Sequence, residues 1–165
     1  MSGKIRKYLL VLAVLLLTEG PGIARAEERI TVGAVEDVIL LPWKVLLPAR
    51  IDSGARFSSL DARELKIVDN RAEFRLPEKF GGRELRLPVV DWHTVRSAEA
   101  AEKRPVVEIG ICFGGKTIQG KFNLNDRSAV RYPVLIGRDI LRKNFIVDPQ
   151  KNRLISPNCP EEAAR

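Results

Sequence analysis

Short apolar runs broken by Gly, Pro, Asn and Asp are the feature that most restricts the fold of this chain. Two hairpins are the clearest: residues 65–76 alternate apolar and polar side chains around an Asp-Asn pair, and residues 105–124 flank a Gly-Gly-Lys turn. Only residues 138–143 favour a helix, because an acid lies in the first turn and bases in the last. Many short strands with one helix predict an all-β barrel or sandwich.

Residues 91–104 interrupt this pattern. Because the segment has no clean period and many polar side chains, we expect a long mobile loop with one helical turn at residues 97–101. Pro48 lies inside an expected strand and favours an edge position or a bend there. The other expected strands are residues 29–41 with a break at Glu36-Asp37, 43–51, 57–65, 85–90 and 134–136, and a last pair formed by 145–147 and 153–155.

The N-terminal residues have the pattern of a secretory leader. Three basic side chains at residues 4–7 precede an apolar run at residues 8–17, and Ala24-Arg25-Ala26 offers a small-x-small cleavage site. We expect a signal peptide at residues 1–26, one mature domain at residues 27–158 and a frayed tail at residues 159–165. A bilayer needs roughly 20 apolar residues, so we expect a periplasmic or secreted protein with no stable membrane span after cleavage.

The charge pattern argues against a nucleic-acid partner. The leader carries four basic side chains and one acidic one, so the formal net charge falls from +7 to +4 without it. The remaining basic residues alternate with acids and aromatic residues are few, which favours a solvated surface over a nucleic-acid groove.

The two cysteines leave two interpretations open. Cys112 lies inside an apolar strand-like run, and Cys159 lies near the C-terminus. In an oxidising compartment the two can form a disulfide, but a buried free thiol at Cys112 fits the pattern equally well.

An acidic turn at residues 52–55 is the strongest candidate for chemistry. If the preceding apolar residues form a strand, the turn holds Asp52 at the end of that strand, and Gly54 permits a tight backbone there. A carboxylate of this kind can take a proton from water when a second carboxylate shares one proton with it. The alternative is a plain turn in which Asp52 accepts hydrogen bonds from nearby amides.

Two widely separated stretches resemble one family. Residues 51–55, Ile-Asp-Ser-Gly-Ala, are similar to the signature of retroviral-type aspartic peptidases, and residues 134–141, Val-Leu-Ile-Gly-Arg-Asp-Ile-Leu, are similar to their second signature. The resemblance is sharper to a bacterial group of retropepsin-like proteins often catalogued as ATP-dependent zinc proteases. That group's landmarks match residues 49–62, 104–107, 125–128 and 132–138.

The resemblance implies a retropepsin-like closed barrel of short antiparallel strands with one short helix near the C-terminus. It implies Asp52 as the catalytic acid and base, with a peptide or protein as substrate. Because the chain holds one Asp-Ser-Gly, the second carboxylate is expected to be Asp52 of another copy in a homodimer. The residues expected to support the catalytic loop are Ser53, Gly54, Ala55, Leu135, Ile136 and Gly137.

The sequence favours neither a metal nor a nucleotide cofactor. His93 is the single histidine, no His-Glu-x-x-His occurs, and the cysteines lack a paired spacing. The bacterial group commonly has Thr where this chain has Phe57 and often has His where it has Asp61, which further weakens a metal site. The turn at Gly114-Gly115-Lys116 lacks the spacing of a phosphate loop.

Three functions remain open at the level of sequence. The first is a periplasmic retropepsin-like endopeptidase in which Trp92 and His93 lie on a lid over the substrate cleft. The second is a non-catalytic module that binds an extended peptide or an envelope component in the same cleft. The third is an amide hydrolase that acts on a peptide-modified wall fragment. The alternative to the lid is that Trp92 is an ordinary loop residue and His93 a loop or partly buried residue.

Overall fold

The computed structural model describes residues 29–96 and 101–159, in which strands are the main secondary structure. The secretory leader predicted at residues 1–26 lies outside them. The elements are β1 (Ile30–Val32), β2 (Val35–Leu41), β3 (Val45–Ile51), β4 (Ser58–Asp61), β5 (Arg63–Val68), β6 (Arg71–Arg75), the 3₁₀ turn η1 (Glu78–Phe80), β7 (Glu84–Pro88), β8 (Asp91–Arg96), β9 (Ala101–Phe113), β10 (Lys116–Asn125), β11 (Val134–Ile136), α2 (Arg138–Asn144) and β12 (Phe145–Val147).

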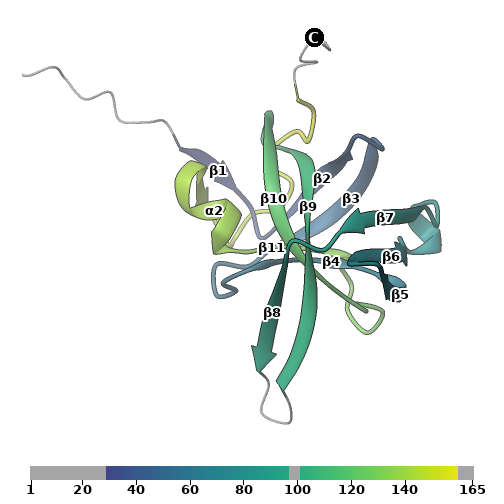
Figure 1. The fold of residues 1–165 in the computed structure, drawn as a ribbon. Helices are drawn as coiled ribbons and strands as arrows, with labels where there is room; N and C mark the ends of the chain where they lie inside the picture. Colours follow the sequence, from purple (N-terminus) through teal and green to yellow (C-terminus); the bar gives the residue numbers. More distant parts are fainter. Residues whose placement is uncertain (1–28, 97–100, 160–165) are drawn as a thin grey trace, which may run out of the picture.

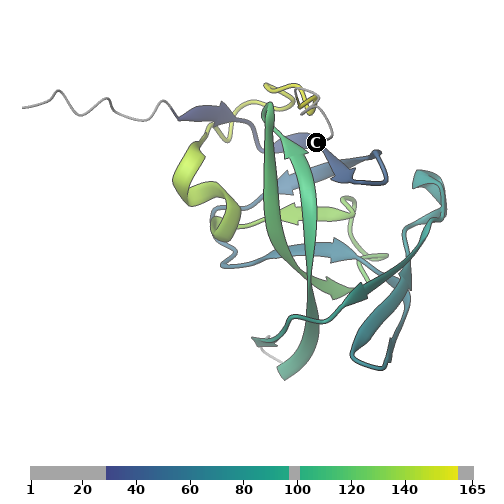
Figure 2. The ribbon, with the colours of Figure 1, turned by 45° about the horizontal axis from the view of Figure 1, so that its top comes forward.

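Six strands close into a barrel, and this confirms the predicted all-β fold with one short helix near the C-terminus. The strand order is β10-β4-β11-β3-β2-β9, and β9 pairs back to β10 (Figures 1 and 2). The barrel is not wholly antiparallel, because β11 runs parallel to β3 and β10 runs parallel to β4. This arrangement inserts β11 between β3 and β4, beside the acidic turn that joins them.

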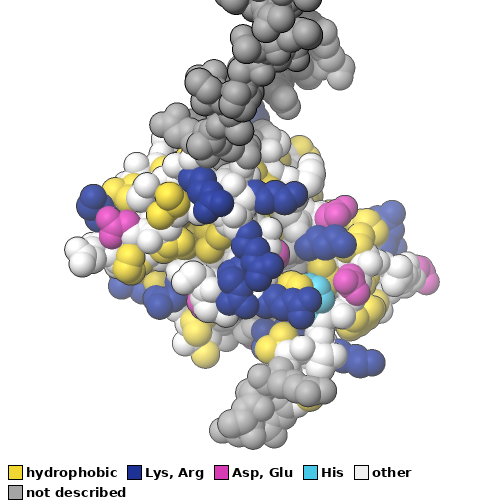
Figure 3. All heavy atoms as spheres, turned by 90° about the vertical axis from the view of Figure 1, so that its left-hand side faces the viewer, with side chains coloured by type: hydrophobic (Ala, Val, Ile, Leu, Met, Phe, Trp, Pro, Cys, Tyr) yellow, Lys and Arg dark blue, Asp and Glu magenta, His cyan; other side chains and the backbone are white. Residues whose placement is uncertain are grey.

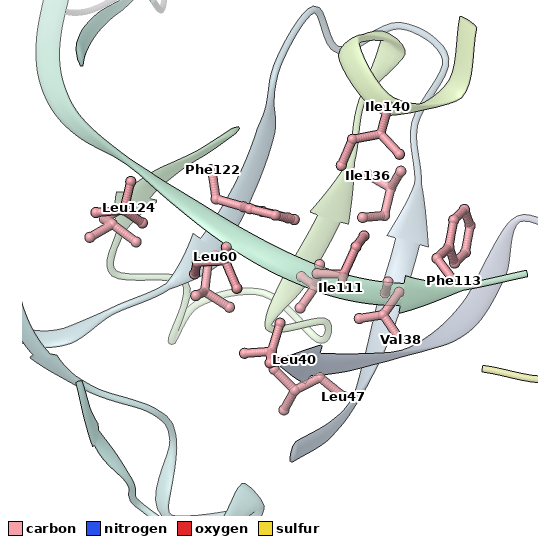
Figure 4. Packing of buried hydrophobic residues seen from close by; sticks show 14 of the residues in the cluster. Val38, Leu40, Leu47, Leu60, Ile111, Phe113, Phe122, Leu124, Ile136 and Ile140 are labelled. Carbon is pink, nitrogen blue, oxygen red and sulfur yellow. The ribbon is translucent and has the colours of Figure 1, made fainter. Parts of the chain in front are cut away.

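The barrel interior is filled by branched and aromatic side chains from every wall. Val38, Leu47, Leu60 and Phe122 are completely buried, and Figure 4 shows them converging from different strands. Ile140 of α2 covers one end of this core beside Ile136 (Figure 4). Full burial of a side chain of this size contributes about 1.5–3 kcal/mol, so barrel closure rather than the single short helix stabilises the fold.

The prediction of a long loop at residues 91–104 is wrong, because these residues belong largely to two strands. β8 pairs antiparallel with the first part of β9, from Asp91 opposite Val106 to Arg96 opposite Ala101. Figure 1 shows this hairpin projecting beyond the barrel, where both faces of each strand can carry polar side chains and the alternation becomes hard to detect. The helical turn expected at residues 97–101 lies mostly outside the described residues, and Ala101 belongs to β9.

Two further strand predictions have different outcomes. At Pro48, β3 pairs with β2 but not with β11, whose register with β3 begins at Ala49, so the residue has the locally unpaired side that an edge position requires. The first strand breaks at residues 33–34 rather than at Glu36-Asp37, since Glu36 is fully buried and accepts the N–H of Gly33.

The C-terminal segment also differs from its predicted form. β12 pairs in parallel with β1, so residues 153–155 do not form the expected partner strand. The same segment is bound to the barrel, because Glu36 accepts the N–H groups of Leu154 and Ile155. A disulfide joins Cys112 to Cys159, which decides between the two interpretations of the cysteines and ties the first residue of the expected tail to β9.

Within residues 29–96 and 101–159, no helix has the length and apolar character needed to cross a membrane.

Candidate active site

Asp52 follows β3 directly and begins a loop, residues 52–57, that we call the Asp52 loop. The side chain is half-buried, and its backbone N–H donates to the carbonyl of Ile136 at 2.9 Å. Its Oδ1 accepts the N–H groups of Gly54 at 2.9 Å and Ala55 at 3.1 Å. The carboxylate is therefore held in one orientation by the loop that it begins, within reach of solvent.

Two glycines allow this loop to pack closely. A Cβ at Gly54 would lie 3.1 Å from Oδ1 of Asp52, which is tighter than an ordinary contact. A Cβ at Gly137 would lie 2.7 Å from the backbone carbon of Phe57, where no atom fits. Gly54 leaves room for the carboxylate, and Gly137 lets β11 and α2 approach the Asp52 loop.

Arg138 binds the loop from its outer side. One nitrogen, Nη1, donates to the carbonyls of Ser53 at 2.8 Å and Gly54 at 2.7 Å. The backbone N–H of Arg138 donates to the carbonyl of Ala55 at 3.0 Å. A single residue at the start of α2 therefore fixes three consecutive carbonyl groups after Asp52.

Ser58 and Asp139 form a second link between the Asp52 loop and α2. Asp139 accepts the hydroxyl of Ser58 at 2.7 Å and its backbone N–H at 3.0 Å. The hydroxyl oxygen in turn accepts the N–H of Gly137 at 3.0 Å. Ser58 is fully buried; these bonds satisfy its hydroxyl and its N–H, and its carbonyl accepts Nδ2 of Asn123 at 2.7 Å.

Arg127 gives this end of the barrel a half-buried positive charge. Its Nη1 donates to the hydroxyl of Ser59 at 2.9 Å, and its Nε donates to the carbonyl of Tyr132 at 3.1 Å. Burial lowers the pKa of Arg127, the negative charges of Asp61 and Asp52 raise it, and the positive charge of Arg104 lowers it. Arg127 and Arg104 therefore lie within electrostatic reach of one another, and Arg127 within reach of Asp52.

Asp61 is a buried acid with a structural role. Its Oδ1 accepts the backbone N–H of Arg127 at 2.9 Å, and its Oδ2 accepts Nη2 of Arg63 at 2.8 Å. The hydrogen bond to Asp61 raises the pKa of Arg63. Among the described residues, no three His, Cys, Asp or Glu side chains gather in a way that could hold a metal ion.

Trp92 and His93 lie on β8 rather than in a loop. Trp92 is 46% exposed, whereas His93 is only 9% exposed and stacks on Phe57 of the Asp52 loop. Both rings of the stack line a hollow of about 520 Å³ that reaches Lys121 of β10 and Asp139 of α2. Figure 3 shows Lys and Arg side chains gathered beside the single histidine on this face.

The structure thus brings most of the predicted site residues together. Gly54 and Ala55 donate to the Asp52 carboxylate, with Ser53 between Asp52 and Gly54 in the chain. Leu135 and Ile136 run beside β3 in the pairing of β11, and Gly137 packs against Phe57 of the Asp52 loop. Three contributors were missed: the side chain of Arg138, the Ser58–Asp139 pair and Arg127. A signal existed for all three, since Arg138 and Asp139 follow Gly137 within the second signature and Arg127 lies in the matched stretch 125–128.

A closed six-stranded barrel with an Asp-Ser-Gly turn between β3 and β4, and a Gly-Arg-Asp sequence after β11, defines a protein of the retropepsin-like class. The chain belongs to the RimB-like family, the retropepsin-like aspartic endopeptidase RimB family, whose model matches residues 31–158.

Curated relatives combine this domain with other sequence. Two proteins named probable alpha-L-glutamate ligase, from Shewanella pealeana and Shewanella halifaxensis, are each 30% identical over 115 residues. The match covers 64% of this chain and 25% of each relative, so the chain spans about a quarter of the length of these relatives.

A solved structure has the same fold. The crystal structure of a Legionella pneumophila protein with unknown function, assigned to DUF785, matches with a TM-score of 0.65 and 30% sequence identity. The match covers 75% of this chain and 96% of that one.

Proposed function

We propose that this protein is an aspartic endopeptidase that cuts peptide bonds with a pair of Asp52 carboxylates, one from each subunit of a homodimer. The observation that carries the proposal is the fixed carboxylate of Asp52, whose Oδ1 accepts two loop amides while the side chain stays half-buried. The exposure of Ser53 and Gly54 supports it, because a second copy must reach this loop to complete the pair.

In this mechanism the two carboxylates share one proton and act on a single water molecule. One carboxylate takes a proton from the water, whose oxygen forms a bond to the peptide carbon. The other carboxylate gives its proton to the carbonyl oxygen. When the tetrahedral intermediate collapses, the carbon–nitrogen bond breaks and the leaving nitrogen takes the proton that the first carboxylate removed from water. A hydroxyl of the intermediate returns its proton to the second carboxylate, which restores the shared proton.

We further propose that the preferred substrates are peptides with acidic side chains. Two observations support this preference. Arg127 carries positive charge within electrostatic reach of Asp52, and attraction between opposite charges favours an acidic peptide in the cleft. The curated relatives are named probable alpha-L-glutamate ligase, which is consistent with a domain that acts on glutamate-containing chains.

We also propose that the mature protein acts in the periplasm or outside the cell. The leader pattern of residues 1–26 supports this location. The disulfide between Cys112 and Cys159 supports it independently, since disulfides persist in oxidising compartments.

The direct test is hydrolysis of a peptide library by the wild type and by Asp52→Asn. We expect the variant to retain its fold by circular dichroism and to lose cleavage, because an amide cannot act as the base. Asp69→Asn is the matched control, since Asp69 lies in an exposed turn with a positive φ of 48° that asparagine tolerates. Equal peptide binding by the wild type and Asp52→Asn with no cleavage by either would instead establish a binding module.

Mixing the wild type with Asp52→Asn tests whether two subunits share one active site. When wild-type protein exchanges subunits with an equal amount of Asp52→Asn, half of the wild-type chains enter mixed dimers. We therefore expect the activity per wild-type chain to fall to about half. Unchanged activity after complete exchange would mean that each copy works alone.

A further inference from the structure

The β8–β9 hairpin is joined to the Asp52 loop by one aromatic stack. The ring of His93 on β8 lies 3.7 Å from the ring of Phe57, centroid to centroid, with an interplanar angle of 26°. His93 is 9% exposed, whereas the side chains before and after it on β8 are exposed. The strand therefore turns this single side chain inward, against the loop that begins at Asp52.

The ring of His93 is poorly prepared to carry a charge in this position. No residue of the described chain makes a hydrogen bond with its buried Nδ1. Its Nε2 lies 3.8 Å from Oδ2 of Asp91, which is longer than a hydrogen bond. The neutral ring is therefore the form that suits this site.

Charged groups of both signs face His93 from the elements around it. Negative charge comes from Asp91 on the same strand and from Asp139 on α2, and positive charge comes from Lys121 on β10 and Arg56 on the Asp52 loop. Arg104 is its register partner on β9, and Glu108 of β9 and Lys143 of α2 line the same hollow as His93. Burial lowers the pKa of His93 and outweighs the carboxylates, which raise it, while Lys121 and Arg56 lower it further.

Phe57 offers little compensation to a protonated ring. The guanidinium carbon of Arg56 already lies 4.8 Å from the centroid of the Phe57 ring, so this aromatic face has a cation beside it. A second cation in the stack would gain less from the ring and would be repelled by Arg56.

We propose that His93 is a positioning residue: its neutral ring holds the base of the β8–β9 hairpin beside the Asp52 loop, and protonation of the ring releases the hairpin. The consequence for catalysis rests on the proposed peptidase function, because the hairpin would then be correctly placed for peptide binding only when His93 is neutral. The coupling between hairpin and loop does not depend on that function.

The sign of the pH effect follows from the lowered pKa. Histidine in an unfolded or open segment titrates near pH 6.5. Since the folded pKa of His93 is lower, the stack contributes its full stability above that value and loses it as the pH falls through the folded pKa. Acid therefore opens the hairpin, and neutral pH holds it against the loop.

Trp92 provides the measurement, because it is exposed on β8 beside His93. In a Trp43→Phe background it is the single tryptophan, and its fluorescence and the hydrogen exchange of residues 91–96 and 101–106 report the hairpin. We expect both signals to change cooperatively as the pH falls, with a midpoint below 6.5. In His93→Phe, which keeps a stacking ring without a titrating group, we expect both transitions to disappear.

Phe57→Leu tests the stack itself at neutral pH. We expect exchange in residues 91–96 to rise roughly two- to tenfold, the range that corresponds to the loss of an aromatic pair. An acid transition that persists in His93→Phe, or hairpin exchange that is unchanged in Phe57→Leu, would overturn the proposal. All measurements are repeated in Asp52→Asn, so that an absence of peptidase activity cannot be mistaken for a failure of the coupling.

Peptide cleavage adds a second readout. If the chain is a peptidase, we expect the wild type to lose substrate affinity in the same acid range, seen as a rise in KM, and His93→Phe to retain a low KM there. An acid rise in KM of equal size in both proteins would overturn the role of His93 in catalysis.

Discussion

At the scale of single residues, three carboxylates organise the backbone around the candidate site. Asp52 orders its own loop, Asp139 joins that loop to α2, and Glu36 binds the C-terminal segment to the barrel. Each accepts at least two backbone or hydroxyl donors. Charge-assisted bonds of this kind are stronger than neutral ones, so a few acids can hold segments far apart in the sequence in one arrangement.

The Ser58–Asp139 pair should be energetically coupled. We expect Asp139→Ala to lower the free energy of unfolding by about 2–3 kcal/mol, because the buried Ser58 loses the acceptor of its hydroxyl and its N–H. Ser58→Ala should cost less, and the double variant less than the sum of the two, by about 1 kcal/mol. Urea unfolding of the four proteins measures the coupling, and strictly additive effects would contradict it.

Loss of the Arg138 side chain should affect the order of the Asp52 loop and catalysis more than the free energy of unfolding. Arg138→Ala removes the bonds to the carbonyls of Ser53 and Gly54, and we expect about a tenfold loss of kcat together with faster exchange in residues 53–57. Arg142→Ala is the matched control, because Arg142 is exposed in the same helix. Equal losses in the two variants would indicate a general effect of charge instead.

At the scale of elements, local patterns predicted the parts that depend on neighbours in sequence. The hairpins β5–β6 and β9–β10, the strand β11 and the helix α2 each have a turn or an end signal within a few residues. β8 was missed because it projects from the barrel and carries polar side chains on both faces, so its sequence shows no alternation of apolar and polar residues. The parallel partner of β12 could not be predicted, since β1 lies more than a hundred residues away.

The residues of the candidate site were likewise predictable only where they lie close together in the sequence. Asp52, Gly54 and residues 135–137 were found because they form two continuous signatures. The Ser58–Asp139 bond spans 81 positions, and the Phe57–His93 stack joins two residues with unremarkable local contexts. Asp139 was interpreted as a first-turn acid that favours the helix dipole, because its hydrogen bonds to a distant strand have no local pattern.

Glu36 should be the main anchor of the C-terminal segment. In Glu36→Gln the new amide meets a backbone donor at Leu154 or Ile155, so we expect a loss of about 2–3 kcal/mol and faster exchange in residues 153–156. Asp37→Asn is the adjacent control, with an exposed contact to Arg153 worth less than about 1 kcal/mol. A larger effect at Asp37 would contradict this assignment.

At the scale of the whole molecule, the disulfide closes the chain from β9 to its last described residue. Cys112 and Cys159 are 47 positions apart, and closing a loop of that length stabilises a fold by up to about 4 kcal/mol. We expect Cys112→Ala/Cys159→Ala to unfold at a lower temperature and to be insensitive to reductant. The melting temperature of the wild type should fall by a similar amount when the disulfide is reduced. An unchanged melting temperature of the reduced wild type would contradict the prediction.

The length of β9 ties two parts of the molecule together. One continuous strand of 13 residues forms a wall of the barrel at one end and half of the projecting hairpin at the other. Any substitution that tilts this strand inside the core therefore also moves the β8–β9 hairpin outside it, because the same strand belongs to both. Substitutions at buried positions of β9 such as Ile109 or Ile111 should therefore change which groups the β8–β9 hairpin contacts while leaving Asp52 itself unchanged.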